Sequence, residues 1–114
     1  MDVEVFENKF TTVRVSGNVE IRDVIKVRTA IEEALSRSPN GLIIDLSDVD
    51  YIDSAGVSAL VFAYRQLVKG GGKLAVIAVR GNVKKVLSIT RLDALPGMFV
   101  SDNIPSAESM LEAA

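Results

Sequence analysis

The sequence predicts one α/β domain spanning residues 1–114, with a mixed, mostly parallel sheet that begins in an N-terminal hairpin and carries about four helices. Three observations predict this class. Short apolar segments alternate with segments of helical periodicity after the first 20 residues. The segments LIIDL (42–46) and KLAVIAV (73–79) are almost continuously apolar, as is typical of parallel strands buried on both faces. A chain of 114 residues can bury roughly two-thirds of its unfolded surface in one core.

The N-terminal half contains a hairpin, a helix, a strand and a second helix. Residues 3–6 and 10–17 alternate between apolar and polar side chains, and we expect them to pair. A helix follows at about 23–36, where a single stripe is apolar: Val24, Val27, Ile31 and Leu35. After the strand at 42–46, a helix from about 54 to 69 ends at three glycines, a strong stop signal.

The C-terminal half continues the alternation. The strand at 73–79 precedes a helix at 82–92, which has one apolar face: Val83, Val86, Leu87 and Thr90. A brief strand at 97–100 and a helix at 105–114, with Pro105 in its first turn, complete the chain. Strands separated by helices are expected to run parallel, with right-handed crossovers.

Composition excludes several classes of function. The chain has no histidine and no cysteine, and therefore no Ser-His triad, disulfide or thiolate zinc site. A net charge of −2 gives no electrostatic reason to expect nucleic acid or an anionic membrane as a partner. The N-terminus lacks the features of a signal peptide, and no apolar run approaches the roughly 20 residues of a membrane span. We expect a cytoplasmic protein without a metal or cofactor.

The junction between the strand at 42–46 and the helix at 54–69 carries the most informative polar residues. Asp53 suits the N-cap, because its carboxylate can accept hydrogen bonds from the backbone N–H groups of Ala55 or Gly56. Ser54 would then be the first helical residue, with a free hydroxyl. In the alternative, Ser54 is the cap and Asp53 lies in the loop.

Helical geometry separates the residues of this second helix into two faces. At 100° per residue, one stripe is expected to be buried: Val57, Leu60, Val61, Tyr64, Leu67 and Val68. Ser54, Ser58 and Phe62 fall on the other side. An exposed phenylalanine near an exposed serine suggests a docking patch for a partner. The alternative is that Phe62 packs against a neighbouring helix.

The segment LIIDLSDVDYIDSAGVSAL (42–60) resembles the signature of the anti-sigma factor antagonists, which are members of the STAS domain family. The family pattern is an apolar strand, Asp-Leu-Ser, a hydrophobic pair, and Asp-Ser followed by Ser or Ala and then Gly at the start of a helix. The segments VRVSGNVE (13–20) and LVKGGGKLAVIAVRGNVKKVLSITRLDAL (67–95) match the family on both sides. The resemblance covers essentially the whole chain.

The resemblance implies a protein that is a substrate and a binding partner, with no catalytic residues of its own. The serine after the aspartate, here Ser54, would be phosphorylated by an anti-sigma factor with a GHKL-type ATP-binding fold, and a serine phosphatase would reverse the modification. The unphosphorylated form would bind the anti-sigma factor and release the sigma factor. We expect partner contacts from one group of residues: Glu20, Asp48, Asp50, Asp53, Ser54, Ala55, Gly56, Ser58 and Phe62.

Electrostatics makes such a switch plausible. A phosphate adds about −1.5 to −2 charges at pH 7. Free N–H groups at a helix N-terminus should tolerate it within the fold. Asp48, Asp50 and Asp53 are expected to make the rim of the site negative already. The penalty would therefore fall on partner binding.

The chain departs from the family pattern at several positions. Asn18-Val19-Glu20 stands where the family has Glu-Leu-Asp, which bears on partner identity. Ser58 replaces a second helical glycine, and Arg91 replaces the glycine expected before Leu92. Ala55 removes the neighbouring serine often found there, which makes Ser54 less ambiguous as the expected acceptor. The alternative function from this resemblance is a scaffold or ligand-sensing STAS module in a larger signalling assembly.

Other chemistries are less well supported by the sequence. The GGGK segment at 70–73 lacks the full spacing of a phosphate loop and precedes a strand. The aspartates at 45, 48, 50 and 53 could hold Mg²⁺, but no acidic pair follows the hairpin as receiver domains require. A Ser-Lys hydrolase would need a lysine beside Ser54, and the nearest in the same helix is Lys69, about four turns away.

Overall fold

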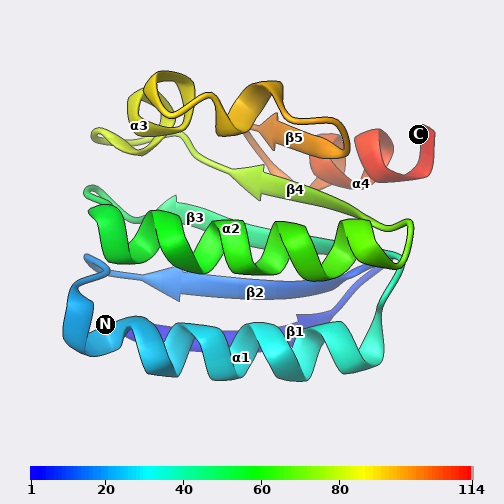
Figure 1. Ribbon diagram of the computed structural model, residues 1–114, viewed down its shortest axis with the longest axis horizontal. Coiled ribbons are helices and arrows are strands. Elements are labelled where there is room, and N and C mark those ends of the chain that lie inside the picture. Colours follow the sequence, from blue (N-terminus) through cyan, green and yellow to red (C-terminus); the bar gives the residue numbers. More distant parts are fainter. Residues whose placement is uncertain (114) are drawn as a thin grey trace.

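The computed structural model describes residues 1–113, which form a five-stranded sheet with helices on both faces (Figure 1). The strands lie in chain order across the sheet: β1 (Asp2–Glu7), β2 (Thr11–Ser16), β3 (Gly41–Asp48), β4 (Lys73–Ile77) and β5 (Met98–Ser101). β1 pairs with β2 in antiparallel orientation, and the remaining neighbours are parallel. The predicted fold class, a mostly parallel sheet begun by a hairpin, is confirmed.

The helices follow the predicted alternation. They are α1 (Val24–Arg37), α2 (Ser54–Lys69), α3 (Val83–Ile89) and α4 (Ile104–Ala113), with short 3₁₀ turns at Ile21–Asp23 and Leu92–Ala94. The bounds of α2 agree with the prediction because its cap and its glycine stop are local signals. The last residue of the predicted terminal helix, Ala114, lies outside the described residues.

The predicted helix at 82–92 is too long. α3 ends at Ile89, and Arg91 adopts a left-handed conformation with φ of 60° before the second 3₁₀ turn begins. A side chain in this conformation costs roughly 1–2 kcal/mol, which is why glycine is common at such positions. This is the position at which the family pattern has glycine. Thr90, predicted on the apolar face, is exposed.

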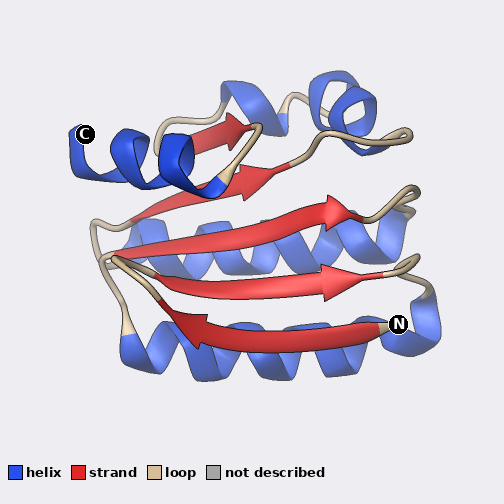
Figure 2. Ribbon diagram, turned by 180° about the vertical axis from the view of Figure 1, so that it is seen from behind, coloured by secondary structure: helices blue, strands red, loops and turns tan. Residues whose placement is uncertain are grey.

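Helices cover the two faces of the sheet unequally. α1 and α2 lie on one face, and α4 lies on the other, where it leaves β1 and β2 uncovered (Figures 1 and 2). Alternate residues of β3 serve the two sides: Leu42 and Ile44 join the larger core beneath α1 and α2, whereas Ile43 packs with residues of α4. Strands buried on both faces therefore explain the continuous apolar runs in the sequence.

The buried faces of the two long helices are centred on small residues. In α2 the buried residues are Gly56, Ala59, Leu60, Ala63 and Leu67. The predicted stripe is therefore partly wrong, because Val57, Val61 and Tyr64 are only half-buried and Val68 is exposed. In α1 the buried residues are Val27, Ala30, Ile31 and Ala34. Small side chains let both helices lie close to the sheet, and they carry little signal on a hydrophobicity pattern.

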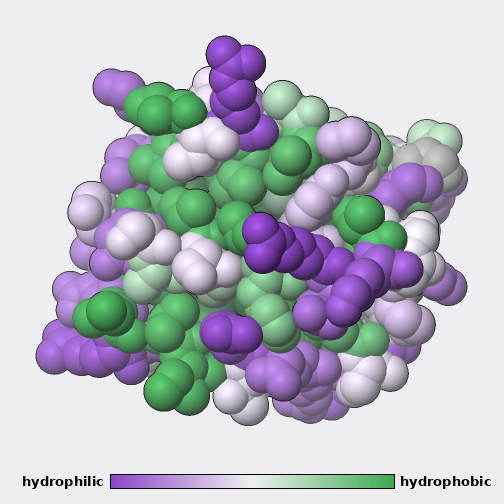
Figure 3. Space-filling view, in the orientation of Figure 1, coloured by the Kyte–Doolittle hydropathy of each residue, from purple (hydrophilic) through white to green (hydrophobic). Residues whose placement is uncertain are grey.

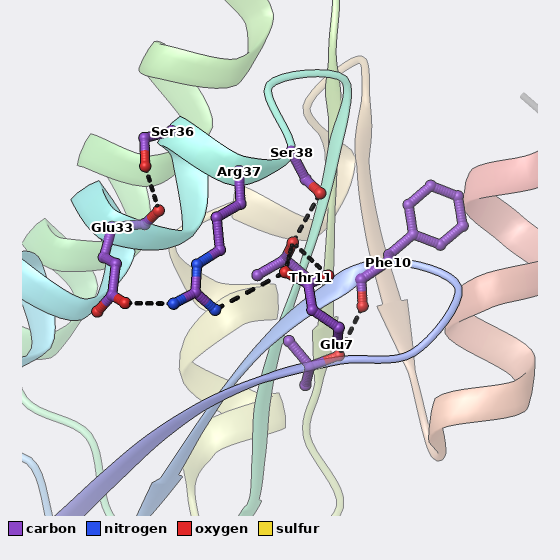
Figure 4. Close-up of polar contacts among 8 residues, drawn as sticks. Glu7, Phe10, Thr11, Glu33, Ser36, Arg37 and Ser38 are labelled. Atoms are coloured by element: carbon purple, nitrogen blue, oxygen red, sulfur yellow. Dashed lines mark hydrogen bonds and ion pairs between the residues drawn. The ribbon is translucent and has the colours of Figure 1, made fainter.

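Polar contacts fasten the β1–β2 turn to the C-terminus of α1 (Figure 4). Arg37 lies 2.6 Å from Glu33 and 3.8 Å from Glu7. The Thr11 hydroxyl donates to the Glu7 carboxylate at 2.9 Å and lies 2.6 Å from the Ser38 hydroxyl. This cluster stands at the amino-terminal ends of the parallel strands, so the loops that follow those strands emerge at the opposite edge. Within residues 1–113, no helix is long and apolar enough to cross a membrane.

Candidate functional site

Three loops meet at the carboxyl-terminal edge of the parallel strands, the edge where open α/β sheets usually carry their binding sites. They follow β2 (residues 17–20), β3 (49–53) and β4 (78–82). Val19 of the first loop forms an isolated bridge with Ile52 of the second. The backbone N–H of Ile52 donates to Asn82 Oδ1 of the third at 3.1 Å. The loop before α2 is therefore held from both sides.

Asp53 caps α2 and leaves Ser54 free. The Asp53 Oδ1 atom accepts hydrogen bonds from the backbone N–H groups of Ala55 at 3.0 Å and Gly56 at 3.1 Å. Ser54 is the first residue of the helix and is exposed. Among residues 1–113, no side chain forms a hydrogen bond with the Ser54 hydroxyl. Of the two alternatives left open by the sequence, the structure confirms the one in which Asp53 is the cap.

Gly56 allows the first turn of α2 to approach the loops. A Cβ atom here would overlap Ile52 Cγ1 and lie 3.0 Å from Ile52 Cδ1 and 3.6 Å from Val19 Cγ1. Val19 and Ile52 are themselves buried. Gly56 is also buried, so it shapes the site through this close packing and presents no side chain to a partner.

The loop after β4 packs directly on the loop that leads to Ser54. The backbone N–H of Asn82 donates to the Asp50 carbonyl at 3.0 Å. Gly81, with φ of +57°, lies so close to that carbonyl that a Cβ atom would overlap it. Arg80 Nε lies 2.9 Å from Asp50 Oδ1, and Arg80 also approaches Asp48 Oδ1 at 3.8 Å. Sequence reasoning missed these contacts, because the two loops are about 30 residues apart.

Arg80 changes the electrostatic description of the rim. Asp48 and Asp50 are exposed as predicted, but both face this guanidinium. The pKa of Arg80 is raised, chiefly by its hydrogen bond to Asp50, then by the charge of Asp50 and, less, by that of Asp48; slight burial opposes this. The carboxylate of Asp53 is occupied in capping. The rim before Ser54 is therefore less negative than the sequence alone suggests.

Glu20 lies at the end of the loop that carries Val19. It is exposed, its carboxylate lies 3.2 Å from Arg22, and its backbone N–H donates to Asp23 Oδ2 at 3.2 Å. Beyond it, two large apolar side chains are exposed, Ile21 at 77% and Ile25 at 75%. The sequence analysis did not single them out, although Ile25 lies outside the predicted apolar stripe of its helix and Ile21 precedes that helix. Figure 3 shows hydrophobic residues among hydrophilic ones on this face, over the N-terminal halves of α1 and α2.

Phe62 is not the exposed side chain that the sequence suggested. It is half-buried and packs against the main core, and the guanidinium of Arg28 in α1 lies 4.1 Å from the centre of its ring. The alternative, packing against a neighbouring helix, is confirmed. Phe62 still lines a shallow groove between α1 and α2 with the exposed residues Ser58 and Arg65. On α2 the groove begins at Ser58, one turn beyond Ser54.

The four aspartates do not form one cluster. Asp45 is buried within the sheet, where it pairs with Arg14 at 3.0 Å and accepts from the Ser47 N–H at 2.9 Å. Among residues 1–113 no three acidic side chains converge as they would around a metal ion. Lys69 ends α2, whereas Ser54 begins it. The geometry offers an accessible serine hydroxyl at a helix N-terminus, surrounded by three packed loops.

Comparisons with known proteins agree with this description. Residues 1–107 match the sequence profile of the STAS domain. A protein of Thermotoga neapolitana named as an anti-sigma factor antagonist homologue is 32% identical over 82 residues, 72% of each chain. The crystal structure of an anti-sigma factor antagonist from Mycobacterium paratuberculosis superimposes with a TM-score of 0.84 at 26% identity, covering 97% of this chain and 93% of that one. The Bacillus cell-fate determinant SpoIIAA, solved in its phosphorylated form, has the same fold, with a TM-score of 0.69 at 19% identity over 96% of each chain.

Proposed function

The chain belongs to the STAS domain family, and we propose that it is an anti-sigma factor antagonist whose binding is switched by phosphorylation of Ser54. In this proposal the unphosphorylated protein binds an anti-sigma factor in the cytoplasm and thereby releases the sigma factor. The anti-sigma factor is also the serine kinase, and a separate phosphatase removes the phosphate. The chain itself contributes no catalytic group.

One observation carries the proposal: the Ser54 hydroxyl is exposed at the start of α2 while Asp53 performs the capping. A serine that capped its own helix would have its oxygen committed to a backbone N–H, and phosphorylation would break that bond. Here the hydroxyl is available to a kinase without loss of a contact. The relative of 32% identity, named as an anti-sigma factor antagonist homologue, supports the antagonist role, and SpoIIAA, which shares the fold, has been solved in a phosphorylated form.

The physical basis of the switch is the change of charge at an otherwise intact surface. A phosphate of about −1.5 to −2 charges at the N-terminus of α2 is favoured by the helix dipole, so the fold should remain stable. A partner that packs on Ser54 and the neighbouring exposed Ser58 meets both the added charge and the added volume. A loss of about 3 kcal/mol in binding free energy would weaken affinity more than a hundredfold.

The contact surface that we propose combines the exposed members of the predicted set. Glu20, Asp48, Asp50, Ser54 and Ser58 are all exposed. Asp53, Ala55 and Gly56 contribute indirectly, because they fix the position of the first turn of α2. Phe62 contributes as a half-buried residue that lines the groove, rather than as a fully exposed side chain.

The proposal is tested with the cognate anti-sigma factor, identified by pull-down of the unmodified protein from its own cell extract. Incubation with this kinase and ATP is expected to add one phosphate, detected by intact mass and mapped to Ser54. Ser54→Ala should accept none, stay folded and bind constitutively, whereas Ser54→Asp should bind more weakly. Ser58→Ala is the matched control for phosphate acceptance and should still accept one phosphate, because Ser58 is also exposed and lies one turn further along the same helix. Phosphate on another residue, or on none, would contradict the proposal.

A further inference from the structure

An exposed ion-pair cluster involves the segment that precedes Ser54, the proposed phosphorylation site. Arg80 bonds to Asp50 at 2.9 Å and approaches Asp48 at 3.8 Å, and all three side chains are about half exposed or more. Within residues 1–113, Arg80 is the cation that forms ion pairs with the acidic residues of the loop leading to Ser54. The end of β3 and the loop together carry three formal negative charges, at Asp48, Asp50 and Asp53.

The ion pair is not what holds the loops together. Two other hydrogen bonds already do so: the Asn82 N–H donates to the Asp50 carbonyl, and the Ile52 N–H donates to the side-chain oxygen of Asn82. Exposed ion pairs typically contribute little to folding stability. The main consequence of Arg80 is therefore the electrostatic field that it creates near the N-terminus of α2, where its positive charge offsets that of the nearby carboxylates.

That field matters for a phosphoryl transfer. The donor nucleotide is anionic, and the modified serine carries about −1.5 to −2 charges. In water, one unit charge about 10 Å away changes the pKa of such a group by roughly 0.3, and a doubly charged donor feels about twice that effect. The effect diminishes with added salt, because the Debye length is about 8 Å at physiological ionic strength.

We propose that Arg80 is the charge-balancing residue of the switch: it offsets Asp48 and Asp50, which eases the approach of an anionic phosphoryl donor to Ser54 and stabilises the dianionic phosphoserine. Arg80 acts through space and touches neither the donor nor the hydroxyl. The part of the inference that concerns the donor rests on the proposed function. The part that concerns the phosphoserine depends only on the field inside this chain.

A purely structural role for Arg80 predicts different behaviour. If the Arg80–Asp50 ion pair served to hold the two loops together, adding Asp50→Asn to Arg80→Gln could not restore function, because the ion pair would still be missing. If Arg80 acts through its charge, Arg80→Gln should be harmful and the double variant Arg80→Gln/Asp50→Asn should recover, since the local net charge is then restored. Arg80→Lys keeps the charge and should resemble the parent protein.

The deciding experiment places phosphoserine at position 54 by genetic encoding and follows its second pKa by ³¹P NMR at low ionic strength. No kinase is needed. Arg80→Gln is expected to raise this pKa by about 0.3, and Arg80→Gln/Asp50→Asn should return it towards the parent value. Arg37→Gln, an equal change of charge at the opposite end of the molecule, should leave it unchanged. High salt should reduce the differences. Thermal melts verify that every variant is folded.

The same variants are then phosphorylated by the cognate kinase. Arg80→Gln is expected to lower kcat/KM about threefold at low salt, with recovery in the double variant. If the parent protein accepts no phosphate, the proposed function fails, but the NMR result still decides the role of Arg80 within the chain. If Arg80→Gln leaves the phosphoserine pKa unchanged, or if Asp50→Asn does not repair it, the charge-balancing role is wrong.

Discussion

Gly56→Ala reverses the usual effect of replacing glycine in a helix. At an ordinary helical position this substitution raises the free energy of unfolding by about 1 kcal/mol, because alanine loses less backbone entropy. At Gly56 the new Cβ would overlap Ile52 Cγ1 and lie 3.0 Å from Ile52 Cδ1 and 3.6 Å from Val19 Cγ1. Tertiary packing therefore opposes local helical preference at this one position.

The size of the effect follows from the burial of the two neighbours. Ile52 is 3% exposed and Val19 is 2% exposed, and their backbones are bridged, so neither side chain can swing into solvent. Overpacking of this kind typically costs 1–3 kcal/mol. The overlap with Ile52 Cγ1 places the cost in the upper part of this range, about 2–3 kcal/mol. After subtraction of the helical gain of about 1 kcal/mol, we expect Gly56→Ala to lower the free energy of unfolding by about 1–2 kcal/mol. For a domain of this size, Tm should fall by roughly 4–8 °C.

Urea and thermal unfolding measure this change directly. Gly70→Ala is the matched control: at that position φ is −94° and the nearest atom to a new Cβ would be the Leu67 carbonyl oxygen at 3.8 Å, so little change is expected. Ile52→Ala removes both clashing atoms, and in that background Gly56→Ala should no longer be harmful. A Gly56→Ala protein as stable as the parent would refute the close approach of α2 to the loops.

Three further substitutions test other parts of the structure. Asp53→Ala removes the cap of α2 and should lower the free energy of unfolding by about 1 kcal/mol in urea titrations. Asp53→Asn should retain most of the stability of the parent protein, because asparagine is also a good N-cap. Equal losses in the two variants would contradict the capping role. Arg91→Gly should raise Tm, with a gain of about 1 kcal/mol, because φ is 60° there; a lower Tm would show that the Arg91 side chain stabilises the fold. Phe62→Ala should cost about 1–3 kcal/mol of stability, read from thermal melts, because the ring packs on the core beneath Arg28. An unchanged Tm would indicate that the Phe62 ring is exposed and contributes little to the core.

Local signals predicted much of the fold and the chemistry of the junction. The cap at Asp53 and the glycine stop after Lys69 fix α2 because each depends only on residues within a few positions. The apolar runs of β3 and β4 were recognisable because both faces of those strands are buried. The same logic failed for α3, since the left-handed residue Arg91 is not a glycine and gives no stop signal.

Features that depend on contacts between distant segments could not be predicted. The hydrophobic pattern of α2 favoured its valines, whereas the sheet selects the smaller Gly56, Ala59 and Ala63 because they permit close approach. Phe62 was placed on the outer face because α2 was considered alone, and Arg28 belongs to another helix. The pairing of Arg80 with Asp50 joins residues 30 positions apart.

The cap and the proposed modification site are adjacent, and in this proposal Asp53 has a role beyond helix stability. Its carboxylate occupies the N–H groups of Ala55 and Gly56. Without that carboxylate, we expect the Ser54 oxygen to accept a hydrogen bond from the free N–H groups of the first turn, as serine often does at a helix start. A hydroxyl engaged in that way is a poorer nucleophile for a kinase, and a phosphate placed on it would remove the substitute cap. Assigning the two tasks to neighbouring residues therefore keeps Ser54 reactive while the helix stays anchored, and a single serine could not do both.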